Sequence, residues 1–267
     1  MKDAAIGVFD SGMGGLTVMR ALMAGMPSES FVYLGDTARL PYGTKGADTV
    51  TRYAVQAVSA LVKRKIKLLV VACNTASGVA LPALNEAFAP LPVIDVIAPG
   101  AEAALAASPQ GPIAVIATEG TVRAGAYERA IRARAPKVPV LQQACPLLVP
   151  LAEEGLIEGA IVDLAIHRYL DSLLERAPAA LVLGCTHYPV LRDAIARIAG
   201  PDIVLVDSAA TVALAVERRL AQDGLLREGP PMPHRFLATD AAKRFARIGE
   251  IFLGQRIAPG SVELVDL

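Results

Sequence analysis

Two of the three cysteines stand at matching points of the sequence, where a thiol could do chemistry. Cys73 directly follows the apolar run Leu68–Ala72, and Cys185 follows the similar run Ala180–Leu183 plus one glycine, two residues before His187. Short, uniformly apolar runs are typical of strands buried in a parallel sheet, and ligands bind at the carboxyl ends of such strands. A thiol there, at the start of the next helix, ionises more readily than a free cysteine, whose pKa is about 8.5. The pattern therefore predicts two reactive thiols at ligand-binding edges.

Paired thiols suit one task in particular, the inversion of a carbon centre. One thiolate removes a proton from one face of the carbon, and the other thiol returns a proton to the opposite face, without redox chemistry. A protease or acyl transferase would need a single cysteine with a base and an oxyanion hole. His187 could assist the Cys185 thiolate or protonate a substrate group. Each cysteine alone could equally be a packed core residue, so the hypothesis depends on the pair; Cys145 lies outside the pattern and is interpreted as structural.

A glycine-rich segment at residues 10–15, Asp-Ser-Gly-Met-Gly-Gly, lies between the first predicted strand and a helix. Its glycines expose backbone N–H groups that could receive an anion such as a carboxylate. Asp10 could orient an ammonium group or help to manage the proton of a thiol. Gly12 and Gly14, followed by Asp36, also resemble a dinucleotide fingerprint, which would indicate a dehydrogenase. Thr17 occupies the third glycine position, however, and a dehydrogenase would give the paired cysteines no role.

Other polar residues follow the predicted strands. The loop Asp36–Gly43 is rich in turn residues, and Tyr42 with the backbone of Gly43 could contact a small polar substrate. Glu153 could accompany His187. Neither the cysteines nor the histidines, at positions 167, 187 and 234, have the spacing of metal ligands, so no metal site is predicted.

The elements that must position these residues alternate between strands and helices along most of the chain. Helical patterns cover Thr49–Lys65, Ile161–Glu175 and Thr211–Gln222, and the clearest breaks are Ala98–Gly100 and Gly229–Pro233. Such alternation indicates an α/β fold with mainly parallel sheets flanked by helices. The predicted buried strands are Ile6–Phe9, Phe31–Leu34, Leu68–Ala72, Val93–Val96, Ile113–Ala117, Val138–Leu141, Ala180–Leu183 and Ile203–Val206.

A weak internal repeat relates the two halves of this pattern. Ser11 and Thr118 each follow a similar apolar run, the run that ends at Leu34 resembles the run that ends at position 141, and the two strand-end cysteines correspond in the same way. The offset between the paired positions is nearly constant. Any two strand–helix–strand segments look somewhat alike, but here three strand ends recur in the same order. We therefore expect two similar α/β lobes, each presenting one cysteine at the carboxyl end of a strand.

Composition narrows the class of protein. The 267 residues carry 26 basic and 26 acidic side chains, a balance that argues against a basic nucleic-acid groove or a polybasic membrane face. The longest uncharged stretch, residues 68–85, contains Asn74 and Pro82 and does not resemble a spanning helix. Residues 1–9 lack the apolar region of a signal peptide, and three cysteines are too few for a disulfide scaffold. We expect a cytoplasmic protein with neither nucleic acid nor membrane as a partner.

Seven motifs together resemble one known family, the glutamate racemases within the aspartate/glutamate racemase superfamily. The resemblance extends from the N-terminus to about position 210. Its Asp-Thr-Ala, Pro-Tyr-Gly and Cys-Thr-His-Tyr-Pro elements point to glutamate as the substrate. The motifs are Gly7–Gly12, Gly14–Val18, Tyr33–Ala38, Pro41–Gly43, Ala72–Ser77, Ala144–Leu147 and Gly184–Pro189.

The resemblance implies cofactor-independent interconversion of L- and D-glutamate, which supplies D-glutamate for peptidoglycan. Cys73 and Cys185 would be the acid/base thiols, with Asp10 assisting the first thiol and Glu153 and His187 assisting the second. The implied substrate contacts are Asp10, Ser11, Pro41, Tyr42, Gly43, Asn74, Thr75, Thr118, Thr121, Thr186 and His187.

The resemblance also implies a domain organisation and an assembly. A discontinuous first lobe would comprise residues 1–97 plus 207–267, and a second lobe would comprise residues 98–206, with the active site between the two lobes. The protein would form a homodimer. Three alternatives stay open at this point: a racemase for another amino acid such as aspartate, a dehydrogenase, and a two-lobed amino-acid receptor.

Overall fold

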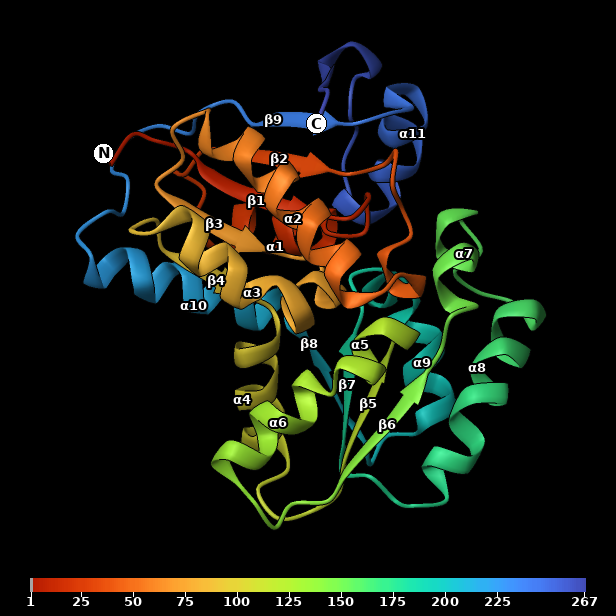
Figure 1. Cartoon of the computed structure of the whole chain (residues 1–267). Coiled ribbons are helices and arrows are strands. Elements are labelled where there is room, and N and C mark those ends of the chain that lie inside the picture. Colours follow the sequence, from red (N-terminus) through yellow and green to blue (C-terminus); the bar gives the residue numbers. More distant parts are fainter. Residues whose placement is uncertain (1) are drawn as a thin grey trace.

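A computed structural model describes residues 2–267 as two parallel β-sheets flanked by helices (Figure 1). The larger sheet has the strand order β10-β9-β2-β1-β3-β4, and the smaller has the order β6-β5-β7-β8. The strands of the larger sheet are β1 (Ile6–Asp10), β2 (Phe31–Gly35), β3 (Leu68–Val71), β4 (Val93–Asp95), β9 (Arg235–Ala238) and β10 (Val262–Leu264). Those of the smaller sheet are β5 (Ile113–Ala117), β6 (Val140–Ala144), β7 (Ala180–Gly184) and β8 (Val204–Asp207).

The two sheets repeat one arrangement. In the larger sheet β1 pairs in parallel with β2 and β3, and in the smaller sheet β5 pairs in parallel with β6 and β7. The order β2-β1-β3-β4 thus recurs as β6-β5-β7-β8. This confirms the predicted α/β class with two similar lobes. In such a sheet the chain order reverses between the first and third strands, and ligands bind outside the carboxyl ends of the strands at that point.

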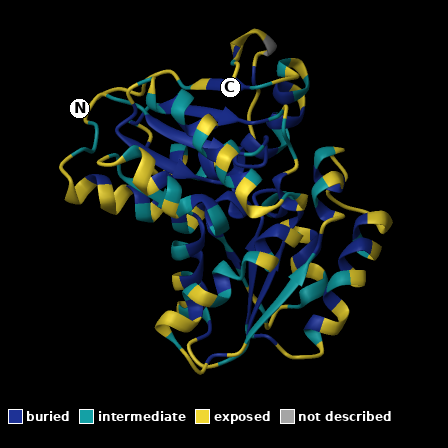
Figure 2. Ribbon diagram, viewed as in Figure 1, coloured by how far each residue is buried: buried dark blue, intermediate teal, exposed yellow. Residues whose placement is uncertain are grey.

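Helices cover both faces of the larger sheet, which explains the uniformly apolar strands. Ile6 and Val8 of β1 pack into one core cluster with Leu16, whereas Phe9 packs into the other cluster with Val58. The central strands β1, β2 and β3 are accordingly dark blue in Figure 2, and exposed residues lie mainly on the outer helices and loops. The helices are α1 (Leu16–Gly25), η1 (Tyr42–Thr44), α2 (Ala47–Val62), α3 (Asn74–Phe88), α4 (Ile97–Ala107), α5 (Glu119–Ala124), α6 (Ala126–Arg134), α7 (Leu148–Glu153), α8 (Ala160–Leu174), η2 (Tyr188–Leu191), α9 (Arg192–Ala199), α10 (Ser208–Gln222), α11 (Ala242–Leu253) and η3 (Pro259–Ser261).

One predicted break is wrong. Ala98–Gly100 lies inside the first turns of α4. A helix tolerates proline there, because the N–H that proline lacks would have no partner within the helix. The other break, Gly229–Pro233, does lie in the loop between α10 and β9. Strand β6 begins two residues later than predicted and includes Gln142 and Gln143, because it is a half-buried edge strand.

The chain distributes its strands unevenly between the sheets. Residues 6–95 and 235–264 supply the larger sheet, and residues 113–207 supply the smaller one. The domain boundaries at 97/98 and 206/207 stay a prediction, and residue 1 of the predicted first lobe lies outside the described residues. Within residues 2–267, no helix combines the length and the apolar character that a membrane crossing requires.

Candidate active site

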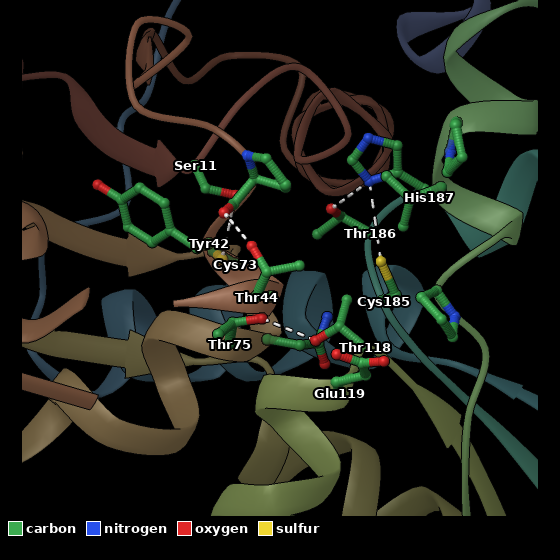
Figure 3. Close-up of a pocket in the computed structure, with 16 residues that line it drawn as sticks. Ser11, Tyr42, Thr44, Cys73, Thr75, Thr118, Glu119, Cys185, Thr186 and His187 are labelled. Carbon is green, nitrogen blue, oxygen red and sulfur yellow. Dashed lines mark hydrogen bonds between the residues drawn. The ribbon is translucent and has the colours of Figure 1, made fainter. Parts of the chain in front are cut away.

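A small cavity lies where the carboxyl ends of strands from both sheets meet (Figure 3). Its volume of about 120 Å³ is well below the roughly 300–1,000 Å³ of pockets for drug-sized ligands. It borders the switch points of both sheets, because Ser11 and Cys73 follow β1 and β3, and Thr118 and Cys185 follow β5 and β7. The lining residues are Ser11, Pro41, Tyr42, Gly43, Thr44, Cys73, Asn74, Thr75, Thr118, Glu119, Pro146, Val149, Pro150, Cys185, Thr186 and His187.

Cys73 caps the N-terminus of α3. Its Sγ accepts a hydrogen bond from the backbone N–H of Ala76 at 3.5 Å and donates one to Ser11 Oγ at 3.4 Å. Burial, together with the nearby Asp10 carboxylate, raises the pKa of the thiol to about 12. Cys73 is therefore a protonated thiol at neutral pH.

Asp10 ends β1 and is fully buried. Its Oδ2 accepts a hydrogen bond from the N–H of Gly12 at 2.9 Å, and its Oδ1 has no hydrogen-bond partner within the described chain. Burial raises the pKa of this carboxyl, although the charge of His187 and neighbouring backbone N–H groups oppose the shift. Asp10 can therefore take up or release a proton near Cys73.

Cys185 belongs to a chain of three polar groups. Its Sγ lies 3.8 Å from Nδ1 of His187, and Nε2 of the same imidazole lies 3.1 Å from Glu153 Oε1. Burial alone would lower the pKa of His187, but its hydrogen bonds to Cys185 and Glu153 raise the pKa to about 10. Burial opposes ionisation of Glu153 too, yet His187 and Arg244 hold its pKa below the ordinary value. At neutral pH the pair is an imidazolium and a carboxylate.

The two thiols therefore have opposite electrostatic surroundings. Cys73 lies near a buried carboxylate, whereas Cys185 lies beside an imidazolium. Figure 3 shows them on different sides of the cavity. The surroundings of Cys73 therefore favour its protonated form, whereas a positive charge lies next to Cys185.

Hydroxyl and amide groups supply donors between the two thiols. Thr75 and Thr118 lie 2.9 Å apart through their Oγ1 atoms, and Thr121 hydrogen-bonds both of them. Asn74 accepts a hydrogen bond at Oδ1 from Tyr127, at 2.8 Å. Its buried Nδ2 has no partner among residues 2–267, and Asn74 lines the cavity. That arrangement leaves an N–H donor available to an anionic group of a ligand.

The glycine-rich segment packs closely against the second lobe. Ser11 lines the cavity, but Gly14 packs against the far lobe, where an added Cβ would collide with Nδ1 of His187. Thr17 Oγ1 donates to the carbonyl oxygens of Gly14 and Thr186, at 2.9 and 3.0 Å. The N–H of Gly12 donates to Asp10 within the chain, and the expectation that the glycines receive the carboxylate of a ligand stays a prediction. A residue with a Cβ at position 14 would occupy the space of the His187 imidazole.

Most of the predicted site residues come together. The lining includes Ser11, Pro41, Tyr42, Gly43, Cys73, Asn74, Thr75, Thr118, Cys185, Thr186 and His187. Asp10, Thr121 and Glu153 lie behind it, in contact with lining residues or with their neighbours. Their individual roles stay a prediction.

Five lining residues were missed: Thr44, Glu119, Pro146, Val149 and Pro150. Three of them had a signal, because Thr44 and Glu119 adjoin predicted residues and Pro146 follows the end of β6. Val149 and Pro150 lie on α7, which no sequence pattern placed near the cavity. Among residues 2–267, no group of three or more His, Cys, Asp or Glu side chains has the arrangement of a metal site.

Comparisons with known proteins agree on one kind of relative. The model of the Asp/Glu/Hydantoin racemase family matches residues 7–216. The glutamate racemase of Geobacter metallireducens is 47% identical over 100% of this chain and 98% of its own length. The crystal structure of Francisella tularensis glutamate racemase in complex with D-glutamate superposes with a TM-score of 0.93 at 36% identity, covering 100% of this chain and 98% of that one. A glutamate racemase isoform from Bacillus anthracis has a TM-score of 0.95 at 38% identity, covering 100% and 99% of the two chains.

Proposed function

This chain belongs to the Asp/Glu/Hydantoin racemase family, and we propose that it interconverts L- and D-glutamate by moving the α-proton between Cys73 and Cys185. The observation that carries this proposal is the pair of cysteines on different sides of one small cavity. Glutamate racemase activity is supported by full-length relatives of that name and by the bound D-glutamate of the Francisella tularensis enzyme. The two-thiol mechanism is our inference from the geometry.

In the proposed step, glutamate lies with its α-carbon between the thiols. Cys185, as a thiolate beside the His187 imidazolium, takes the α-proton from one face, and the Cys73 thiol gives its proton to the opposite face. The product is the other enantiomer, Cys185 is left as a thiol, and Cys73 is left as a thiolate. That state is the one needed for the reverse reaction, so the same pair serves both directions. The step requires no cofactor, because one proton leaves and one arrives.

Negative charge develops on the substrate carboxylate as the α-proton leaves. Preorganised donors aimed at such charge, in a site closed to water, stabilise the transition state strongly. We propose that Asn74 Nδ2 and the hydroxyls of Thr75 and Thr118 are these donors, and that Asp10 helps to manage the proton of Cys73. The free Nδ2 of Asn74 and the linked threonine hydroxyls support this assignment.

We propose that the product D-glutamate supplies peptidoglycan synthesis, and that the protein acts in the cytoplasm as a homodimer. All three cysteines are free thiols. A mechanism that depends on two thiols needs a reducing compartment, which supports the cytoplasmic location.

Exchange of the α-proton tests the proposed function. Purified protein in D₂O, given L- or D-glutamate and no added cofactor, should bring the circular dichroism signal of either enantiomer to zero. It should also place deuterium on the α-carbon, detected by proton NMR. L-Aspartate under the same conditions should react far more slowly. Absence of exchange with both glutamate enantiomers would contradict the proposal, and faster reaction of aspartate would reassign the substrate.

Substitution of Gly14 by alanine should impair the site although no predicted catalytic residue is itself replaced. The added methyl group would collide with the imidazole of His187, and displacing a catalytic group by about 1 Å can cost about 100-fold in rate. We expect kcat to fall by about that factor. Gly12→Ala in the same loop is the matched control, because its Cβ would meet Leu40 at an ordinary 3.6 Å. Equal kcat values for the two variants would refute this role of Gly14.

A further inference from the structure

Helix α11, near the C-terminus, contacts Glu153 and His187 of the other lobe. Arg244 Nη2 lies 3.4 Å from Oε2 of Glu153 and 3.7 Å from Oε1 of Glu154, at the end of α7. Glu153 presents its other oxygen, Oε1, to His187 at 3.1 Å. The carboxylate is thus held at both oxygens, by the imidazole on one side and by the guanidinium on the other. Helix α11 lies beyond residues 7–216, the segment that the family model matches.

The same helix also contacts the imidazole ring directly. Phe252 is fully buried, and its ring meets that of His187 edge to face, with centroids 5.1 Å apart and an interplanar angle of 74°. Such aromatic contacts favour one ring orientation. Arg244 and Phe252 are eight residues apart, so they lie on one face of the helix. Ile251 extends this face to Gly155, just after α7.

Helix α11 is itself anchored to the loop that carries the predicted substrate residues. Thr239 Oγ1 donates to Asp36 Oδ1 at 2.9 Å, and Thr37 Oγ1 donates to the carbonyl oxygen of Asp240 at 2.6 Å. Asp36 also accepts the hydroxyl of Tyr42, at 2.5 Å. These hydrogen bonds fix the segment that leads into α11, and side chains further along the helix contact the other lobe.

We propose that Arg244 positions the Glu153–His187 pair for proton transfer at Cys185, with Phe252 fixing the imidazole ring from the same helix. Arg244 touches neither the thiols nor the cavity, so it is a positioning residue that acts through Glu153. The groups that face His187 are Cys185, Glu153 and Asp10, and Arg244 with Glu154 faces Glu153 from outside. This proposal rests on the proposed function, because Cys185 has to accept and return a proton.

A double-mutant cycle tests whether Arg244 works through Glu153. At pH 7.5 we expect Arg244→Gln to lower kcat about tenfold in both directions, with KM changed less than twofold. In the Glu153→Gln background the same substitution should cost less than twofold, because the carboxylate that it positions is gone. Arg244→Lys should restore most of the loss. Arg247→Gln, on the exposed side of the same helix, should leave kcat unchanged.

A cost of Arg244→Gln that is equal in both backgrounds would overturn the proposal, since it would show a structural effect independent of Glu153. So would a kcat within twofold of the wild type.

Alkylation of Cys185 separates this proposal from the proposed function. Iodoacetamide forms a carbon–sulfur bond with a thiolate and releases iodide, so its rate reports the thiolate that His187 stabilises. We expect Arg244→Gln and Glu153→Gln to slow alkylation of Cys185 several-fold, no more in combination than singly, with Cys73 unaffected. Peptide mass spectrometry measures both sites. If both variants leave the alkylation rate of Cys185 unchanged, Arg244 has no positioning role, even if the protein racemises glutamate. If alkylation slows as expected, the positioning role holds, even if the protein does not racemise glutamate.

Discussion

Replacing either Cys73 or Cys185 by serine is expected to reduce racemisation of glutamate by at least about 1,000-fold while leaving the fold intact. A serine hydroxyl ionises far less readily than a thiol, so it can neither accept the α-proton nor hold the charge left after giving one away. Both cysteines are almost completely buried at strand ends, and a serine of nearly the same shape fits the same space. The loss should therefore appear in kcat and not in the thermal midpoint of unfolding.

The two serine variants should also differ in a way that a one-base mechanism does not predict. The remaining thiol can still remove and return a proton on its own face, so each variant should exchange deuterium into one enantiomer without inverting it. Cys73→Ser and Cys185→Ser should select opposite enantiomers. Cys145→Ala is the control, because Cys145 lies outside the cavity lining and its thiol contacts the carbonyl oxygen of Gln143. Near-normal racemisation by either serine variant would exclude the two-thiol mechanism.

The site residues that could be predicted from sequence are those whose position follows from the residues next to them in the chain. A short apolar run followed by a polar residue places that residue at the carboxyl end of a buried strand. This rule indicated the strand-end positions of Ser11, Cys73, Thr118 and Cys185, which line one cavity. The recurrence of three such strand ends predicted two similar lobes, whose sheets have matching strand orders. Each of these inferences needs only the few residues on either side of a strand end.

The contacts that sequence reasoning missed join distant segments. Arg244 and Glu153 are separated by 91 residues, and no local pattern on either helix indicates that they meet. Gly14 was interpreted as a possible anion site because its own loop allows that, and its close approach to His187 depends on how the two lobes pack. Strand β9 has three apolar residues after Arg235, and two of the three residues of β10 are exposed, so their apolar runs are shorter than those that identified most of the other strands.

Substitution of Glu153 by glutamine should move the pH dependence of racemisation rather than simply lower the rate. In the wild-type protein the hydrogen bonds to Cys185 and Glu153 outweigh burial and raise the pKa of His187 to about 10. Without the carboxylate, one of the two hydrogen bonds that hold this charge is lost, burial opposes the charge more effectively, and the pKa falls below about 10. A fall to about one unit below pH 8.5 would leave about a tenth of the imidazolium at that pH. We expect the alkaline limb of the rate profile to shift to lower pH, with a loss of at least about tenfold at pH 8.5.

The same substitution should change how stability depends on pH, and the sign follows from the direction of the shift. Because the pKa of His187 is higher in the folded protein than in the unfolded chain, its contribution to stability is complete below pH 6.5 and is lost as pH rises toward about 10. Glu153→Gln removes much of this contribution, so the thermal midpoint should vary less across that window. His167→Gln is the control, since that histidine is exposed and pairs with Asp171 on the outer surface. An alkaline limb and a thermal profile that both match the wild type would show that Glu153 does not set the charge of His187.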